Sequence, residues 1–475
     1  MAGEETVVRG AWLAFAAKLV GGVFTAALTI FLARRLGAGE YGLLALALSI
    51  VALVELPSDF GVAVALPRFV AEQRDRPELV RELTADAIRL ETLGSLLFAA
   101  ALAALAGPIA DAYGAHALSG PLRWLALALV GQNFLALFTG VFAAMRRQSL
   151  VLVANAFESF SELTASVALV LLAGGVAAAA AGRTLGYALG GVCALALAYR
   201  LLGRGMLPSL GAGTLGHARR IAAYAGTLWL IDSAYTVFLQ IDALLIAAYT
   251  STASVAFFSA PMRLTGVLQY PGYAIASAVA PRLAGGAPLN GDAFNRSVRL
   301  VSALMVPAAV LTTVWATPIV HVTLGAGYGK AAEVLRALGP YVLLCGAGAL
   351  VSLSLNYLGH ARRRLPIALA TLAVNVLLDA ILIPDIGVTG AAVGTDAAFA
   401  IYVLAQLALC LRIIGSPMKE QLLTLGRCVI AAAPMAAILF AFGTGRLPVL
   451  TMIAGGFAAT VAYLATLLIT GELRR

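Results

Sequence analysis

The stretch FLARRLGAGEYGLLALALSIVALVELPSDFGVAVALPRFVAE, residues 31–72, decides the fold because much of it recurs later in the chain. Its counterpart, AAYTSTASVAFFSAPMRLTGVLQYPGYAIASAVAPRLAG at residues 247–285, aligns without a gap when 214 (271 − 57) is added to the first numbering. The shift brings two prolines and one arginine into register: Pro57 with Pro271, Pro67 with Pro281, and Arg68 with Arg282. Residues of this kind that keep their spacing in a diverged apolar sequence indicate an internal duplication.

The composition places the duplicated unit in a membrane. Of 475 residues, 61% are hydrophobic and 12% charged, and the mean hydropathy is +0.94, whereas soluble domains carry about 25% charged residues. A membrane span needs about 20 apolar residues. Fourteen such segments follow one another, at 11–33, 41–66, 84–107, 121–143, 150–173, 180–202, 221–248, 254–281, 296–321, 333–358, 365–384, 388–412, 422–443 and 447–470. Lipid offers backbone groups no partners, so these long runs are predicted to be helices and not barrel strands.

The shift of 214 maps the first six segments onto the next six. Six is an even number, so both halves enter the membrane the same way round and form parallel repeats. We therefore expect an all-α polytopic membrane protein with about fourteen transmembrane helices, in which two parallel six-helix repeats form two lobes and two extra C-terminal helices follow. The corresponding regions are 1–206, 207–415 and 416–475.

Charge, cysteines and loops restrict the function further. Most Lys and Arg residues fall at the termini and in every second connection, which predicts that both termini are cytoplasmic. The net charge of +9 is explained by this topology and by anionic lipid headgroups, without nucleic acid. The four cysteines form no CxxC pair, and we expect neither a metal site nor a cofactor. The longest polar connection, residues 68–84, is too short for an active-site domain, and nucleotide-binding and hydrolase motifs are lacking, so no enzyme is expected.

Charged residues inside the apolar segments are the candidate functional groups. A charge in the middle of a bilayer costs about 2.5 to 17 kcal/mol, so each should face a cavity or a partner. The candidates are Lys18, Glu55, Asp59, Glu91, Glu158, Glu162, Asp232, Asp242, Arg263, Asp379 and Asp396.

Two carboxylate pairs stand out among these candidates. Glu55 with Asp59, and Glu158 with Glu162, are spaced four residues apart and so lie on one helix face. Two carboxylates in a low dielectric do not both ionise easily, which predicts a site for a proton or sodium. Alternatively, they bond to Ser, Thr or Asn on neighbouring helices or face cytoplasmic water. Asp232, Asp242 and Asp379 are further candidate cavity carboxylates.

Several other residues allow two interpretations. Lys18 and Asp232 are related by the shift (18 + 214), so they either meet across the lobes or pair within their own lobes. Arg263 either forms an ion pair with Asp242 or binds an anionic ligand, for which a guanidinium offers bidentate donors. Pro57 and Pro271 remove a backbone bond each, which predicts either hinges or static kinks.

Four stretches together resemble one family: ARRLGAGEYGLLALALS…DFG…PRFVAE, LQIDALLIAAYTSTASVAFFSAPMRL, LNYLGHARR and NVLLDAILIPDIGVTGAAVGT. In this order they are similar to the polysaccharide-biosynthesis flippases (Wzx-type) of the multidrug/oligosaccharidyl-lipid/polysaccharide superfamily. The resemblance implies two lobes around a cavity that opens alternately to either side. It also implies outward movement of an undecaprenyl-pyrophosphate-linked oligosaccharide, as in O-antigen assembly, in the bacterial inner membrane. Lys18 and Arg263 match positions where such flippases carry cavity cations, so the resemblance implies that both bind the pyrophosphate.

Two other functions are weighed against the flippase. A cation-coupled multidrug antiporter of the same superfamily normally ends after twelve helices, so the two extra C-terminal helices argue against it. A non-transport scaffold of an envelope polysaccharide assembly complex would not need so many intramembrane charges. The expected partners are the lipid-linked oligosaccharide, membrane lipids, and a proton or sodium; the chain is expected to be a monomer, and polysaccharide-assembly proteins are further candidate partners.

Overall fold

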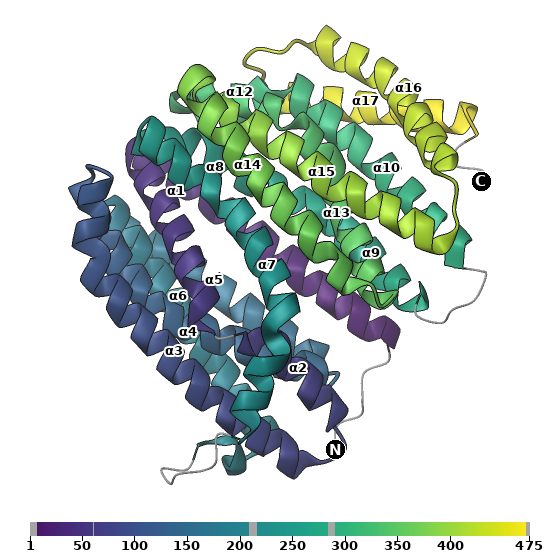
Figure 1. Ribbon diagram of the computed structural model, residues 1–475. Helices are drawn as coiled ribbons and strands as arrows, with labels where there is room; N and C mark the ends of the chain where they lie inside the picture. Colours follow the sequence, from purple (N-terminus) through teal and green to yellow (C-terminus); the bar gives the residue numbers. More distant parts are fainter. Residues whose placement is uncertain (1–6, 60, 209–215, 284–289, 472–475) are drawn as a thin grey trace. The chain divides into compact units, whose positions relative to one another are not determined.

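The computed structural model describes residues 7–59, 61–208, 216–283 and 290–471, and every regular element in these ranges is helical (Figure 1). This confirms the predicted all-α class. The chain divides into two compact units, Met1–Ala248 and Tyr249–Arg475. Large apolar side chains lie on the outside of the helices, for example Leu172 at 84% and Ile469 at 85% exposure, as expected of a protein whose solvent is lipid.

The first unit is built from long helices that pack side by side. Its α-helices are α1 (Val7–Ser58), α2 (Val62–Glu72), α3 (Pro77–Ala112), α4 (Ser119–Ala144), α5 (Gln148–Leu172), α6 (Gly175–Leu202) and α7 (Gly216–Tyr249), the last of which ends at the boundary. The closest packing is between α6 and its neighbours α4 and α5. The core of this unit is formed by apolar side chains of α2, α3, α4 and α6, among them Phe138 and Phe142.

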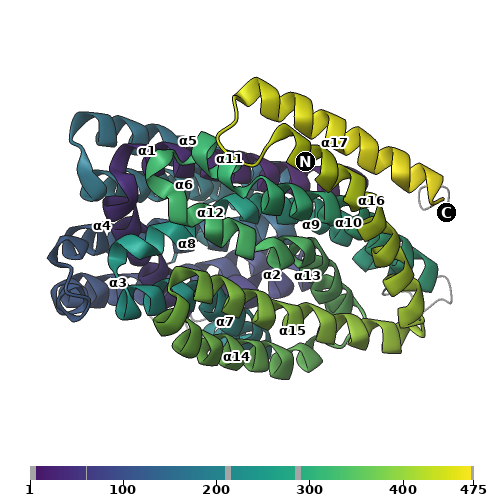
Figure 2. The ribbon, with the colours of Figure 1, turned by 90° about the horizontal axis from the view of Figure 1, so that it is seen from above.

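The second unit contains shorter helices as well as long ones. Its α-helices are α8 (Thr252–Gly266), α9 (Tyr270–Leu283), α10 (Asn290–Val314), α11 (Ala316–Thr323), α12 (Gly329–Ala337), α13 (Gly339–Tyr357), α14 (Arg364–Ile386), α15 (Val388–Ile414), α16 (Met418–Phe442) and α17 (Val449–Ile469). Figure 2 shows α16 and α17 side by side at one edge of this unit. Trp315 donates to the Leu439 carbonyl (3.0 Å) and Tyr463 to the Ala303 carbonyl (3.0 Å), so buried aromatic donors hold this pair against the unit.

α1 joins the predicted span 11–33 to the first part of the span 41–66 in one element with a sharp bend. Gly37 at the bend has a non-helical backbone (φ 71°, ψ 176°). A positive φ of this kind is easily adopted only by glycine, so the helix changes direction here without a loop (Figure 1).

The two prolines predicted to kink helices lie beside helix interruptions. Pro57 is in the last turn of α1, and α2 begins a few residues later, after Gly61 with its left-handed backbone (φ 73°). Pro271 is the second residue of α9, directly after the 3-10 turn Val267–Gln269 that separates it from α8. A proline cannot donate the backbone hydrogen bond of a helix interior. The predicted spans 41–66 and 254–281 are each divided into two helices, the first just after Pro57 and the second just before Pro271.

Eleven helices among the described residues are long and apolar enough to cross a membrane, which confirms a polytopic membrane protein. The number of fourteen remains a prediction. The difference between fourteen and eleven has three causes. α1 counts once although it covers parts of two predicted spans, α5 is not among the eleven, and the span 254–281 is divided between α8 and α9.

Candidate functional site

The end of α1 is held by amide side chains of α4. Gln132 donates to Glu55 Oε2 (2.5 Å), and Asn133 donates to the Ser58 hydroxyl (2.9 Å), which itself donates to the Glu55 carbonyl (2.8 Å). Asp59 Oδ1 accepts the backbone N–H of Gly61 (2.5 Å) just before α2. The first predicted carboxylate pair therefore lies where α1 ends, and neutral donors satisfy part of its hydrogen-bonding capacity.

The second predicted pair, on α5, is bound by an arginine of α6. Arg183 donates to Glu162 Oε1 (2.5 Å) and to the Tyr187 hydroxyl (3.0 Å), and its guanidinium lies 5.0 Å from the centre of the Tyr187 ring. Glu158 Oε2 accepts the Ser159 hydroxyl (3.0 Å). The structure places Arg183 inside a helix, with its side chain 23% exposed, as the counter-ion of Glu162.

Glycines of α6 set the position of the carboxylates on α5. Gly186 and Gly190 face the residues of the pair so closely that a Cβ would lie 2.5 Å from Glu162 Cα and 2.6 Å from Glu158 Cβ, respectively. Glycines four residues apart allow two membrane helices to approach with their backbones nearly in contact. The two glycines, here called the glycine row, are four residues apart, as are the two glutamates, so each glutamate packs against one glycine.

The two pairs and Glu91 of α3 form one charged group within the first unit, here called the N-terminal acidic cluster. Its members are Glu55, Asp59, Glu91, Glu158, Glu162 and Arg183. Glu55 interacts electrostatically with Asp59 and Arg183, Glu91 with Asp59 and Glu55, and Glu158 with Glu162 and Arg183. Five acids and one arginine would leave a net charge of −4 (1 − 5) if all were ionised, and such an excess in an apolar surrounding favours uptake of positive charge.

The second unit repeats one detail of this arrangement. Asp379 on α14 is fully buried, receives a hydrogen bond from Asn375 (3.4 Å), and lies directly against Gly394 of α15. An acid of one helix thus faces a glycine of the next, as in α5 and α6. Asp396 has a different role: its carboxylate accepts the N–H of Tyr341 (3.0 Å) in the first turn of α13, where the helix dipole favours a negative charge.

The remaining predicted residues lie on three helices. Lys18 on α1 and Asp232 on α7 are exposed, whereas Asp242 on α7 is fully buried. All three belong to the first unit, while Arg263 is half-buried in the last turn of α8 in the second unit. The Lys18–Asp232 contact, the Asp242–Arg263 ion pair and the bridging of a pyrophosphate by Lys18 and Arg263 therefore stay predictions.

Arg364 is a buried cation that sequence reasoning missed. It directly follows the exposed Arg362 and Arg363, but it is itself only 6% exposed. It donates to three neutral acceptors: the side chains of Gln406 (3.2 Å), Asn356 (2.9 Å) and Tyr402 (3.1 Å). Asn356 is in the last turn of α13, where a cation is favoured, so Arg364 connects α13, α14 and α15.

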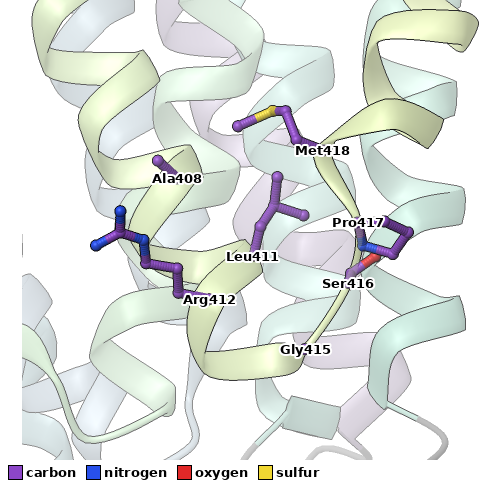
Figure 3. Close-up of a pocket in the computed structure, with 7 residues that line it drawn as sticks. All are labelled: Ala408, Leu411, Arg412, Gly415, Ser416, Pro417 and Met418. Atoms are coloured by element: carbon purple, nitrogen blue, oxygen red, sulfur yellow. The ribbon is translucent and has the colours of Figure 1, made fainter.

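A cavity of about 480 Å³ lies at the turn between α15 and α16. Figure 3 shows Leu411 and Met418 pointing toward one another there, while the Arg412 guanidinium is directed away from them. None of the predicted site residues lines this cavity. It offers one guanidinium and one hydroxyl, from Ser416, and does not extend the N-terminal acidic cluster.

Comparison with known proteins gives three findings. The sequence pattern of the family described as "Polysaccharide biosynthesis protein" matches residues 7–286. The probable low-salt glycan biosynthesis flippase Agl15 of Haloferax volcanii is 22% identical over 455 residues, which cover 94% of this chain and 92% of that protein. Among solved structures, the lipid II flippase MurJ in an inward closed conformation has a similar fold, with a TM-score of 0.79, 14% identity, and coverage of 97% of this chain and 99% of that one.

A transporter structure of another kind is also similar. An inward-facing multidrug resistance transporter of the MATE family of the MOP superfamily matches with a TM-score of 0.68 and 14% identity, over 85% of this chain and 94% of that one. At these identities the structural likeness concerns the fold alone. It agrees with the predicted architecture of an all-α polytopic membrane protein.

Proposed function

We propose that this chain, which belongs to the polysaccharide biosynthesis protein family, is a flippase that moves a lipid-linked oligosaccharide across a membrane. The observation that carries the proposal is the match to the Haloferax flippase over nearly the full length of both chains. The N-terminal acidic cluster supports transport, because charges held inside membrane helices are costly and mark ion or substrate pathways. The protein is a transporter in this proposal and not an enzyme.

The substrate of the proposal is an undecaprenyl-pyrophosphate-linked oligosaccharide, moved from the cytoplasmic to the outer leaflet by alternating access. The six-helix repeats 1–206 and 207–415 form the two lobes, and 416–475 adds the last two helices. A pyrophosphate cannot cross about 30 Å of hydrocarbon without cations, and Arg263 with Lys18 supply them. The protein functions as a monomer in a bacterial inner membrane with cytoplasmic termini, next to polysaccharide-assembly proteins.

The direct test is reconstitution of the purified full-length chain in liposomes with a fluorescent undecaprenyl-pyrophosphate-linked glycan. Transport is measured as the fraction of label that moves out of reach of an impermeant quencher. We expect rapid transport by the wild type, none in protein-free liposomes, and none with Arg263→Ala. The exposed Arg362→Ala is the matched control and should transport normally. A wild type that does not move the glycan under any ion gradient would contradict the proposal.

Ion coupling of the cycle is proposed at the two carboxylate pairs. A variant that carries Gln or Asn at all four positions should lose the acceleration of transport by a proton or sodium gradient. The four positions are Glu55, Asp59, Glu158 and Glu162. If this variant keeps the full response to both gradients, the pairs are not part of the coupling mechanism.

A cation-coupled multidrug antiporter is the second candidate, favoured by the fold of the MATE-family transporter. The two functions differ in substrate chemistry, because an antiporter for drugs needs no pyrophosphate. In the same liposomes, exchange of a cationic dye against protons or sodium without any glycan movement would favour the antiporter. Glycan movement without dye exchange would favour the flippase.

A further inference from the structure

Glu91 has a carboxyl group without a hydrogen-bond donor. It lies on α3 with 1% of its surface exposed, and among the described residues neither of its carboxyl oxygens has a hydrogen-bond partner. The hydroxyl groups next to it along the helix are bonded elsewhere: Ser95 donates to the Glu91 backbone carbonyl (2.5 Å) and Thr92 donates to the Ile88 carbonyl (2.7 Å). No hydrogen-bond donor among the described residues therefore compensates this carboxyl group for its loss of water.

The charged groups that act on Glu91 are acids. Asp59 and Glu55, both on α1, interact with it electrostatically. The other elements packed against α3, which include α2 and α4, contribute no charged side chain to this interaction within the described part of the chain. The nearby donors are already engaged, since Gln132 bonds Glu55 and the Gly61 N–H bonds Asp59. Arg183 is bound by Glu162 and Tyr187.

An ionised Glu91 in this place would be unstable. A carboxylate in an apolar interior without a donor is strongly disfavoured, and two neighbouring carboxylates disfavour it further. A proton compensates the charge and, unlike a metal ion, needs no further ligands around the carboxyl group. Glu158 differs, because Ser159 donates to it and Arg183 is near.

We propose that Glu91 is the proton-carrying residue of the N-terminal acidic cluster: it holds a proton in the state described here and releases it when the helices around it rearrange during transport. This inference rests on the proposed function and adds to it a residue and an ion. The proton moves between water and one carboxyl oxygen, and no other bond is made or broken. Asp59 and Glu55 act as positioning residues, since their negative charges keep the proton on Glu91.

The first experiment does not depend on transport. Infrared spectroscopy of the purified full-length protein in lipid at neutral pH detects the C=O stretch of protonated carboxyl groups. We expect one such band to be lost in Glu91→Gln, and to shift without loss in Glu91→Asp. Asp86→Asn is the control: Asp86 is also buried on α3 but is paired with Arg89 (3.2 Å), so the band should remain. A band unchanged in both Glu91 variants overturns the inference.

The second experiment measures coupling in the liposomes with the lipid-linked glycan. A pH gradient should accelerate transport by the wild type and by Asp86→Asn, whereas Glu91→Gln should transport at the rate without a gradient and take up no protons. An unchanged response of Glu91→Gln to the pH gradient, or a wild type that responds to sodium alone, overturns the proton-carrying role. If the wild type moves no glycan at all, the proposed function fails, while the infrared experiment still decides whether Glu91 holds a proton.

Discussion

The glycine row between α5 and α6 leads to a quantitative prediction for Gly186→Ala. The new methyl group would lie 2.5 Å from both Glu162 Cα and Glu162 Cβ, whereas ordinary contacts begin near 3.4 Å. The helices must therefore separate by about 0.9 Å (3.4 − 2.5) at this point. Neither atom is the end of a flexible side chain, so the strain cannot be relieved by a rotamer change. The shift also moves Glu162 relative to Arg183, with which it forms the ion pair.

The size of the effect follows from two opposing contributions. Overpacking of a tight interface costs about 1–3 kcal/mol, while replacement of a helical glycine by alanine adds up to about 1 kcal/mol of helix propensity. We expect a net loss of about 1–2 kcal/mol. For a unit of this size, each kcal/mol lowers the midpoint of thermal unfolding by about 2–4 °C. The midpoint should therefore fall by several degrees.

The assay is thermal unfolding of the purified protein in detergent, followed by circular dichroism, with Gly426→Ala as the matched control. Gly426 lies inside α16, and a Cβ there would meet no atom within 4 Å. This control should unfold at or slightly above the wild-type midpoint, because only helix propensity changes. Unfolding of Gly186→Ala at the wild-type temperature would refute the reasoning that the glycine row sets the spacing of α5 and α6.

Three further predictions concern charge, substrate and symmetry. Arg183→Gln should destabilise the protein by about 3–5 kcal/mol, because it leaves Glu162 buried without its counter-ion. In a double-mutant cycle measured by denaturation, the added change Glu162→Gln should recover most of this loss. No recovery would contradict the ion pair. Complementation of a transport-deficient strain should be abolished by Arg263→Ala and weakened by Lys18→Ala. Arg263→Lys should retain part of it, because lysine lacks bidentate donors. Full complementation by both alanine variants at normal expression would contradict pyrophosphate binding by these two residues. An experimental structure should superpose the first six helices on the next six by about 180° about the membrane normal; an inverted second half would disprove the repeat.

The class of the fold was determined by the sequence alone, because it depends on local properties. Lipid excludes unsatisfied backbone groups, so the length of each apolar run is enough to predict a helix. Kinks at Pro57 and Pro271 were expected for a similarly local reason, since a proline lacks its own backbone donor, whereas the complete interruptions next to them were not. The connection between the spans 11–33 and 41–66 was also expected, but not that it would be a single bend at Gly37 within one helix, because a glycine can continue a helix or leave it.

The partners of the charged residues were decided only by the tertiary structure. The spacing of Glu158 and Glu162 predicted that they share a face, but it could not show that Arg183, 21 residues away, binds one of them. The run of three arginines at 362–364 looked uniform, yet only Arg364 turns inward to Gln406 and Tyr402. Glu91 was recognised as an intramembrane charge, while the lack of a donor around it depends on how α1, α2 and α4 pack against α3. Hydropathy is a property of each segment, whereas compensation of a buried charge is a property of the packing between segments.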